Sequence, residues 1–305
     1  MTEGPSKTVV RSSPDAVEVD SPARPPKRPA ETRAADRGRP VRALRAAGLR
    51  LVVPVILVAL WWWASTVPDL QLYVVDPLTA VRQFFSDFFT TDASRLFLGD
   101  ATYDDMIPSV LRALGGLALA IVVGVVFGTA IGVSRLLAAM TQPLIHLGRS
   151  LPSPALLGVF FFLFGTGDWP KVLLIAFSIV WPILFNTVDG VASIGQVRAQ
   201  AAQIFRIRDR DVLLRVILPG ASPKIFAGIR TSLSLSLILM IISELQKSEN
   251  GLGYRLVQSQ RVFDYGAFWS VLVMLVVLGL IFNLVFKLIE RRVLAWHRGA
   301  TEQHD

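Results

Sequence analysis

Residues 111–133 read LRALGGLALAIVVGVVFGTAIGV, and this segment decides the fold class. Apart from Arg112 and Thr129 it consists of apolar and small residues, and crossing a bilayer takes roughly 20 predominantly apolar residues. A small residue recurs at every fourth position: Gly116, Ala120, Gly124, Gly128 and Gly132. This ridge follows one helix face and allows another helix to pack closely, as membrane-embedded packing requires. The segment therefore predicts a membrane-spanning helix in a tightly packed bundle.

Five further apolar segments flank this one, so the sequence predicts six transmembrane helices. They cover about residues 51–67, 137–164, 171–190, 225–243 and 267–289. The segment 137–164 is interrupted by Leu151-Pro152-Ser153-Pro154, and neither half is long enough to span a membrane alone.

The composition of the whole chain supports an all-α integral membrane protein. Of its 305 residues, 52% are apolar and 18% charged, whereas soluble domains carry about a quarter charged residues. This disfavours a soluble enzyme or a nucleic-acid-binding protein, despite the net charge of +8. The chain has no cysteine, which excludes disulfides and thiolate metal sites. Its three histidines are too few and too scattered to form a histidine-built metal site. We therefore expect no metal site.

The distribution of Lys and Arg predicts the orientation in the membrane. Most of them fall in residues 1–50, 191–224 and 287–305, and basic loops remain on the cytoplasmic side. The sequence thus predicts cytoplasmic N- and C-termini. Residues 1–50 have no apolar periodicity, which predicts a disordered cytoplasmic tail. We expect a permease domain over residues 51–298 and a short tail over 299–305.

The long polar loop between the fourth and fifth predicted spans carries two short amphipathic stretches. One surrounds Ala201, Ala202 and Phe205, and the other ends at Leu218-Pro219. Exposed apolar residues on short helices suit insertion into a groove on a soluble partner. An interfacial helix pair lying on the membrane has the same pattern, so periodicity alone leaves both open.

This loop resembles the coupling motif of ABC importer permeases. The motif reads Glu-Ala-Ala, three residues, Gly, nine residues, then Ile-x-Leu-Pro. Here it falls as Gln200-Ala201-Ala202, Arg206 and Val216-Ile217-Leu218-Pro219, with the spacing intact. Gln200 replaces the glutamate and Arg206 replaces the glycine. These two departures raise the prospect of a heteromeric pair in which a second permease supplies the standard motif.

Further segments resemble the nitrate/sulfonate/taurine branch of these permeases, over about residues 53–298. They are Arg149-Ser150-Leu151-Pro152 with Gly165-Thr166-Gly167, PKIFAGIR over 223–230, Glu244 with Gly251-Leu252-Gly253-Tyr254, and IERRVLAW over 289–296. The resemblance implies the type I ABC importer permease fold, a bacterial inner-membrane location and import of a small anion such as a sulfonate, taurine, nitrate or an aromatic acid. A neutral pyrimidine-type substrate is the alternative within the branch.

The energy for transport has to come from a partner. The chain contains no G-x-x-x-x-G-K-[ST] phosphate-binding loop, so it is not itself expected to hydrolyse ATP. The resemblance implies ATPase subunits that hold ATP and Mg²⁺, a second permease, identical or different, and an external solute-binding protein. It also implies that residues 196–219 dock on an ATPase. The coupling candidates are Gln200, Ala201, Ala202, Phe205, Arg206, Leu218 and Pro219.

Within the membrane, Arg149 is the main candidate for the substrate pathway. A central arginine costs about 2.5–3.5 kcal/mol on insertion scales, so it should face protein, water or a polar path. It precedes a Pro-interrupted helix whose second half starts near Ser153, and a half-helix N-terminus beside an arginine suits an anion. The alternative is structural: Arg149 caps broken carbonyls or pairs with Glu244 or Asp189.

Hydroxyl and amide groups on the later spans are further pathway candidates. Ser232 and Ser236 share a helical face, and Asn186 lies on the preceding span. Serine hydroxyls also bond carbonyls of their own helix, so a lining role and a local role both remain open. A secondary carrier that works without an ATPase is the competing function, although it would need intramembrane acidic groups for ion coupling.

Overall fold

The computed structural model describes the backbone of residues 39–204, 207–246 and 248–295, and the side chains of 52–194, 207–246 and 248–295. The chain divides between Ile56 and Leu57 into two units. In the described part, the structure is helical apart from one antiparallel bridge between Phe89 and Leu98. The helices are α1 Arg39–Thr66, α2 Pro77–Phe88, α3 Ile107–Val133, α4 Arg135–Ser150, α5 Leu157–Phe164, α6 Asp168–Ile204, α7 Asp209–Val212, α8 Leu218–Glu244, α9 Leu252–Arg261 and α10 Tyr265–Val293.

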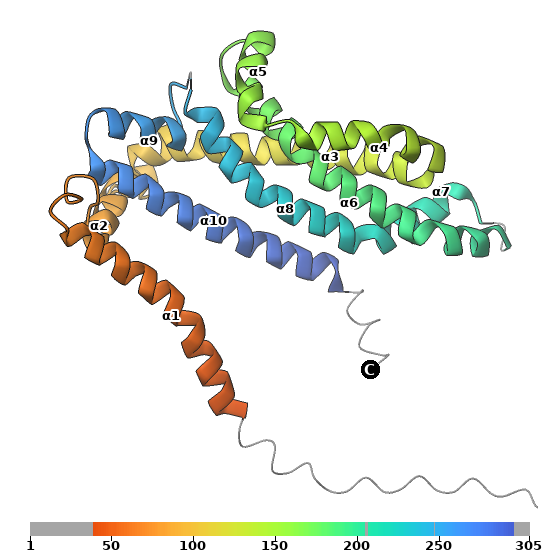
Figure 1. The fold of residues 1–305 in the computed structure, drawn as a ribbon, viewed down its shortest axis with the longest axis horizontal. Coiled ribbons are helices and arrows are strands. Elements are labelled where there is room, and N and C mark those ends of the chain that lie inside the picture. Colours follow the sequence, from red (N-terminus) through yellow and green to blue (C-terminus); the bar gives the residue numbers. More distant parts are fainter. Residues whose placement is uncertain (1–38, 205–206, 247, 296–305) are drawn as a thin grey trace, which may run out of the picture. The chain divides into compact units, whose positions relative to one another are not determined.

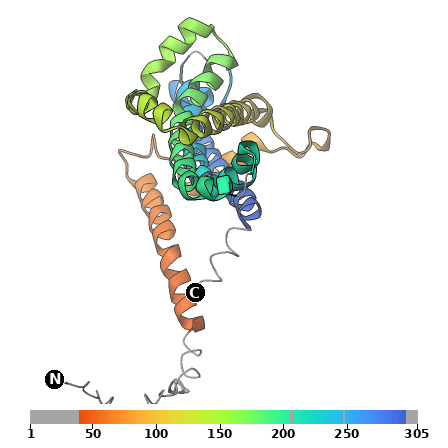
Figure 2. The same ribbon diagram turned by 90° about the vertical axis from the view of Figure 1, so that its right-hand side faces the viewer.

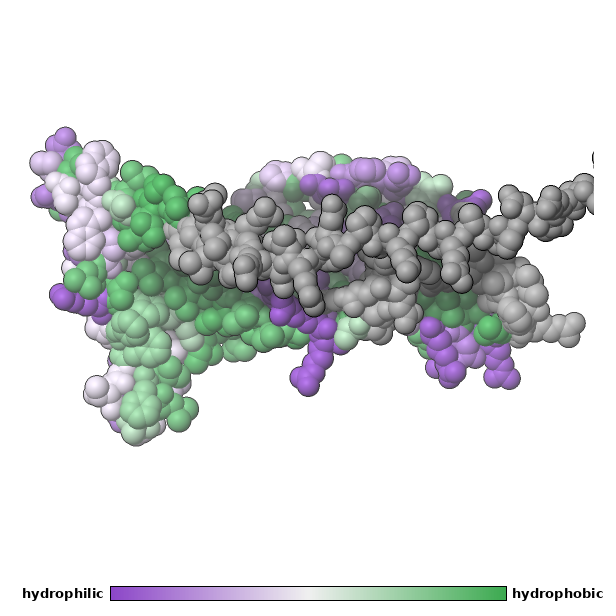
Figure 3. Space-filling view, turned by 90° about the horizontal axis from the view of Figure 1, so that it is seen from below, coloured by the Kyte–Doolittle hydropathy of each residue, from purple (hydrophilic) through white to green (hydrophobic). Residues whose placement is uncertain are grey.

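In the second unit, three long helices form the centre of the bundle. Figure 1 shows α3, α6 and α8 running alongside one another, and α10 packs on α8 and α2. The four long apolar stretches fit membrane spans: Thr102–Val133, Asp168–Ile194, Asp209–Glu244 and Tyr265–Val293. Hydrophobic surface covers much of the bundle in the view of Figure 3. The chain is therefore a multi-pass membrane protein.

The interrupted third span is a sharply bent helix pair. α4 and the segment Ser153–Phe164 meet at 86°, and α5 stands out from the bundle in Figure 1. Pro152 and Pro154 explain the break, because proline removes a backbone donor and disfavours helical geometry in the residue before it. Counted as one span, this pair brings the total to five. The first predicted span corresponds to Val52–Thr66, a shorter apolar helix.

The predicted ridge of small residues on α3 is confirmed as a close helix contact, and its partner is α6. A Cβ at Gly116 would lie 2.6 Å from Cγ2 of Ile175, and one at Gly124 2.8 Å from Cγ2 of Ile183. A Cβ at Gly128 would meet Cβ of Thr187 at 2.7 Å. The two backbones thus approach closely because glycine has no side chain to separate them.

The region around the coupling motif differs from the prediction in its helix boundaries. α6 continues past Gly190 to Ile204. At Gly190 it packs closely on α8, since a Cβ at Gly190 would lie 3.2 Å from Cβ of Ala221. The second short helix is not separate either. α7 leads through a π-helical turn at Leu213–Ile217 directly into α8. α1 begins at Arg39, before the predicted end of the tail at residue 50.

Candidate functional site

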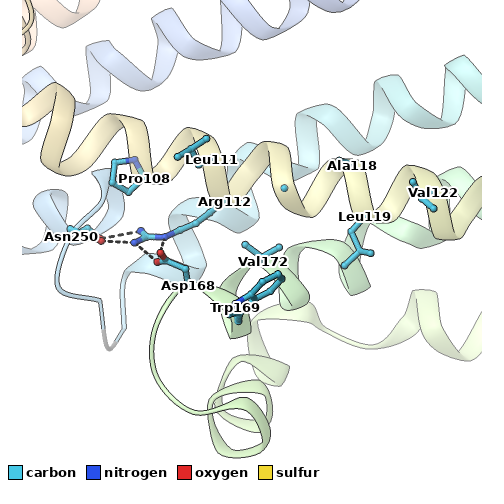
Figure 4. A pocket seen from close by; sticks show the side chains of 11 residues that line it. Pro108, Leu111, Arg112, Ala118, Leu119, Val122, Asp168, Trp169, Val172 and Asn250 are labelled. Carbon is cyan, nitrogen blue, oxygen red and sulfur yellow. Dashed lines mark hydrogen bonds and ion pairs between the residues drawn. The ribbon is translucent and has the colours of Figure 1, made fainter.

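A buried polar network joins three helices at the end of α8. α8 supplies Glu244, α3 supplies Ser109 and Arg112, and α6 begins with Asp168. The loop after α8 adds Asn250, which Figure 4 shows beside the Arg112 guanidinium together with Asp168. Glu244 is 1% exposed and Arg112 3% exposed, so both charges are removed from solvent.

The Glu244 carboxylate is held by donors from two sides. Arg112 Nη1 donates to Oε1 at 2.6 Å, and the Ser109 hydroxyl lies 2.8 Å from both carboxylate oxygens. The backbone N–H of Gly253 donates to Oε2 at 3.0 Å. Since a buried charge is tolerated only when it is paired and hydrogen-bonded, these contacts keep the carboxylate stable in the core.

Two glycines make room for this carboxylate. A Cβ at Gly251 would lie 2.5 Å from Cδ of Glu244, and Gly251 has φ +113°, a conformation that side chains disfavour. A Cβ at Gly253 would lie 2.8 Å from Cβ of Glu244 and 2.6 Å from the Ile241 carbonyl oxygen. The Gly-Leu-Gly sequence therefore allows the loop to close over the end of α8.

Arg112 is the hub of the network. Its Nε donates to Asp168 Oδ1 at 2.7 Å, and Nη2 lies 2.6 Å from the same oxygen. Nη1 also donates to the Asn250 carbonyl oxygen at 3.2 Å, and Nη2 donates to Asn250 Oδ1. A planar guanidinium has five N–H donors, and this arrangement uses all of its edges. Arg112 therefore ties α3 to α6, to α8 and to the loop before α9.

Lys171 adds a second buried cation one turn into α6. It is 2% exposed, and its Nζ donates to Ser248 Oγ at 2.7 Å. The Ser248 hydroxyl in turn donates to the Asn250 carbonyl oxygen at 2.6 Å. The loop 245–251 is thus anchored by both cations, Arg112 and Lys171.

A neighbouring ion cluster connects α9 to the rest of this end. Arg255 of α9 contacts Asp87 at 3.3 Å and Asp105 at 3.4 Å. Asp105 also accepts the Gly251 N–H at 3.0 Å, and Asp87 accepts the Ser270 hydroxyl of α10 at 2.7 Å. The two clusters share the Gly251 turn, so α2, α3, α8, α9 and α10 are linked here by polar contacts.

A pocket of about 690 Å³ opens beside Arg112 (Figure 4). Its polar edge is formed by Arg112, Asp168 and Asn250, and its remaining wall is largely apolar, from α3 and α6. The Asp168 side chain is 66% exposed, in contrast to Arg112. Because Asp168, Glu244 and Asn250 already pair with its guanidinium, Arg112 belongs to a closed ion network in this structure.

The structure places Arg149 away from this network. Arg149 lies at the end of α4, is exposed, and stands with Cζ 5.2 Å from the ring centroid of Phe185 on α6, a cation–π contact. The two acids considered as its partners are engaged elsewhere: Glu244 with Arg112, and Asp189 with Lys224 at 2.7 Å. Ser153 begins the short turn after the bend and is half-buried.

The other pathway candidates are committed to backbone carbonyls. Ser232 is buried and donates across the interface to the Ile179 carbonyl of α6 at 2.7 Å. Ser236 donates to the Leu233 carbonyl of its own helix, and Asn186 Nδ2 donates to the Pro182 carbonyl of its own helix. Their roles along a pathway stay predictions.

The coupling candidates fall largely outside the described side chains. Gln200, Ala201 and Ala202 lie within the helical backbone of α6, but their side chains are outside the described residues. Phe205 and Arg206 lie outside the described residues altogether. Leu218 and Pro219 are half-buried at the start of α8.

Sequence reasoning missed the Arg112 hub. The signal was present: an arginine and a glutamate, each enclosed in an otherwise apolar span, have opposite charges and need a partner in the membrane. They are 132 residues apart, however, and the sequence suggests Glu244 only as one of the alternative partners of Arg149. Among the described residues, no group of three or more His, Cys, Asp or Glu side chains is placed to hold a metal ion.

The chain is similar to known permeases over most of its length. It is 28% identical to the taurine transport system permease protein TauC of Escherichia coli over 242 residues, which is 79% of this chain and 87% of that protein. It is 26% identical to the putative aliphatic sulfonates transport permease protein SsuC of Bacillus subtilis, over 82% of this chain and 87% of that protein. The bicarbonate transport system permease protein CmpB of Synechococcus elongatus is 30% identical over 62% of this chain and 66% of that protein.

The fold is similar to that of a solved importer. An inward-facing structure of the MetNI methionine ABC transporter matches with a TM-score of 0.54 and 18% identity, over 61% of this chain and 93% of that chain. The predicted resemblance to the nitrate/sulfonate/taurine branch is confirmed by the relatives. Residues 120–295 match the family model of the binding-protein-dependent transport system inner membrane component. This chain therefore belongs to that family, as the non-catalytic permease subunit of an ABC importer whose ATPase is a separate subunit.

Proposed function

We propose that this permease moves a small anion of the sulfonate, taurine or bicarbonate type. The observation that carries the proposal is the similarity to permeases for taurine and aliphatic sulfonates, which extends over about four-fifths of the chain. Binding experiments with individual anions of this class would identify the substrate.

The proposed topology has six spans with both termini in the cytoplasm of a bacterium, in its inner membrane. The four long helices, the bent α4–α5 pair and the apolar helix Val52–Thr66 make up the six. The orientation is supported by the basic residues at the N-terminal tail, around residues 191–224 and after residue 287. In this orientation the Arg112 network lies at the external end of the bundle.

Coupling to the ATPases is assigned to residues 196–219. In the described part, α7 and the π-helical turn run without interruption into α8. A push on this segment would therefore act directly along α8, because a continuous helix transmits displacement as a rigid element. ATP and Mg²⁺ belong to the partner ATPase in this proposal, and the solute-binding protein delivers substrate to the external loops.

Arg149 is the proposed anion-contacting residue of the pathway. Its guanidinium is exposed and stands against the face of Phe185 instead of an acidic group, so its charge is available to an anion. It also adjoins the Pro-broken bend where Ser153 starts a new helical turn. A second permease, identical or different, would supply the opposite wall.

The experiment that tests this proposal is purification after co-expression with the neighbouring genes, followed by uptake into liposomes. We expect an ATPase to copurify in equal amount and ATP-dependent uptake of a radiolabelled sulfonate, taurine or bicarbonate. The Arg149→Gln variant should assemble and hydrolyse ATP but lose uptake, because its neutral side chain no longer attracts the anion. Lys224→Gln, which removes a cation that is paired with Asp189, is the matched control.

Two outcomes would contradict the proposal separately. Solute movement by the chain alone without ATP would favour a secondary carrier. Unchanged anion uptake by the Arg149→Gln variant would remove Arg149 from the pathway while leaving the importer function intact.

A further inference from the structure

α2 has an apolar surface that the bundle does not cover. Its buried apolar residues, Ala80, Phe84 and Phe88, face the bundle. A second row is exposed: Leu78, Val81 and Phe85, with Phe85 57% exposed. At about 100° per residue, the exposed row lies directly next to the buried one on the helix circumference, and polar residues such as Arg82 and Ser86 occupy the remaining arc. The apolar arc of α2 is thus continuous: one part of it packs on the bundle, and the other part is uncovered.

The segment after α2 extends this surface. Residues 90–100, here called the 90–100 hairpin, stand out from the side of the bundle as the ochre loop in Figure 2. The hairpin carries Leu96 and Phe97, which are 74% and 57% exposed. Both have positive φ, 53° and 61°, a left-handed conformation that L side chains disfavour. Two successive apolar residues are therefore presented outward against their backbone preference, and such strain marks functional positions.

The hairpin is rigidly held in this conformation. Phe97 N–H donates to the Asp92 carbonyl at 3.1 Å, and Thr90 N–H donates to the Phe97 carbonyl at 3.0 Å. The Asp92 side chain accepts from the Ser94 N–H and hydroxyl. The base is fixed as well, because a Cβ at Gly99 would lie 2.5 Å from the Asp87 carbonyl oxygen. Leu96 and Phe97 are therefore part of a loop whose conformation is fixed by hydrogen bonds.

The aromatic residues around α2 indicate how deep this apolar surface lies in the membrane. α2 packs on the first turns of α10, where Ser270 donates to Asp87. Aromatic residues gather at the same level: Trp61 stacks on Trp269 with ring centroids 4.8 Å apart, and Tyr73 contacts Tyr265 at 5.3 Å. Trp269 Nε1 donates to the Tyr73 carbonyl. Trp and Tyr with one apolar and one polar contact are characteristic of the bilayer–water interface.

We infer that α2 and the 90–100 hairpin form an interfacial anchor, whose exposed apolar residues insert into the boundary between lipid headgroups and acyl chains. A lipid surface fits because the exposed apolar arc of α2 accompanies the Trp and Tyr contacts that are characteristic of the bilayer–water interface, while polar residues occupy the rest of the helix circumference. The hairpin carries exposed Asp92 and Asp100 against one base, Arg95, so zwitterionic lipid is the better match. The inference requires only that the bundle spans a membrane, and it does not depend on the substrate or on the ATPase.

The test uses the absence of native cysteine, which permits single nitroxide labels. Phe85→Cys, Phe97→Cys and Leu96→Cys variants of the full chain, purified with any ATPase partner, are placed in phosphatidylcholine nanodiscs. Collisions with oxygen and with the polar nickel complex NiEDDA are then measured. We expect all three labels to meet NiEDDA about tenfold less often than a label at Ser86, while oxygen collisions stay high, because a polar reagent is excluded from hydrocarbon. Ser86→Cys is the matched control, adjacent to Phe85 but on the polar arc.

Two results would overturn the inference. NiEDDA collisions as frequent as at Ser86 would place these residues in water. Low collision rates with both reagents would place them against protein, either a second permease or a soluble partner. If Phe97→Cys fails to fold, the label at Leu96 still reports on the hairpin. The collision measurement does not require transport, so a failed transport assay would not change its outcome.

Discussion

The two ends of α8 carry the same kind of interaction in opposite surroundings. At the Glu244 end, the Arg112–Glu244 pair is almost fully buried, with side chains 3% and 0% exposed. Near the other end, Lys224 pairs with Asp189, and their side chains are 45% and 57% exposed. Buried partners depend on each other because neither can turn to water, whereas exposed pairs are screened and contribute little.

This difference indicates which end of α8 is free to adjust. The Glu244 end is fixed by ions, by a closing loop and by two glycines that leave no spare space. The Leu218 end follows directly from α7, and the ion pair near it, Lys224–Asp189, is exposed. In the proposed importer, movement would enter α8 at its adjustable end and pivot about the fixed one.

The largest expected effect comes from Glu244→Gln. The neutral side chain leaves the buried Arg112 with Asp168 as its remaining acidic partner, and breaking a buried pair costs about 3–5 kcal/mol. The free energy of unfolding should fall accordingly, as measured by thermal denaturation of the purified protein in nanodiscs. Asp189→Asn, which removes the acid of the exposed Lys224–Asp189 pair near the other end of α8, is the control and should change stability little.

A double variant sharpens this result. When Arg112→Gln is combined with Glu244→Gln, the buried charge disappears with its partner, so the double variant should be more stable than the sum of the two single losses predicts. Additive losses would mean that the two side chains do not depend on each other, and the comparison between the two ends of α8 would fail.

An intermediate effect is expected from Gly253→Ala. The new methyl group would lie 2.6 Å from the Ile241 carbonyl oxygen and 2.8 Å from Cβ of Glu244, and neither can withdraw easily because both belong to α8. Overpacking of this kind costs roughly 1–3 kcal/mol, measurable in the same thermal denaturation. Gly158→Ala is the matched control, because open space surrounds Gly158 in α5. A Gly253→Ala protein as stable as the unchanged protein would show that the loop can move to accommodate the methyl group, which would contradict the tight packing at this end of α8.

The sequence predicted the parts of this molecule that depend on local pattern. The apolar segments, the Pro-broken bend and the glycine ridge of α3 are read within a few turns of helix, and the structure confirms the ridge and the bend. The extension of α6 beyond Gly190 to Ile204 was not predicted, because the apolar segment that predicted the span ends at Gly190. The Arg112 hub was missed because it is assembled from α3, α6, α8 and a loop, and helix periodicity does not determine which charges meet.

The smallest effect is expected from Asp189→Asn. Its partner Lys224 is half exposed and can be solvated instead, so the loss of stability should be no more than about 1 kcal/mol. The loss should shrink further as salt is added, because exposed charges are screened, whereas the defect of Glu244→Gln should persist in high salt. Thermal denaturation at low and high salt distinguishes the two ends. A salt-independent defect in Asp189→Asn as large as that of Glu244→Gln would mean that this end of α8 is held as firmly as the other, and α8 would then have no adjustable end.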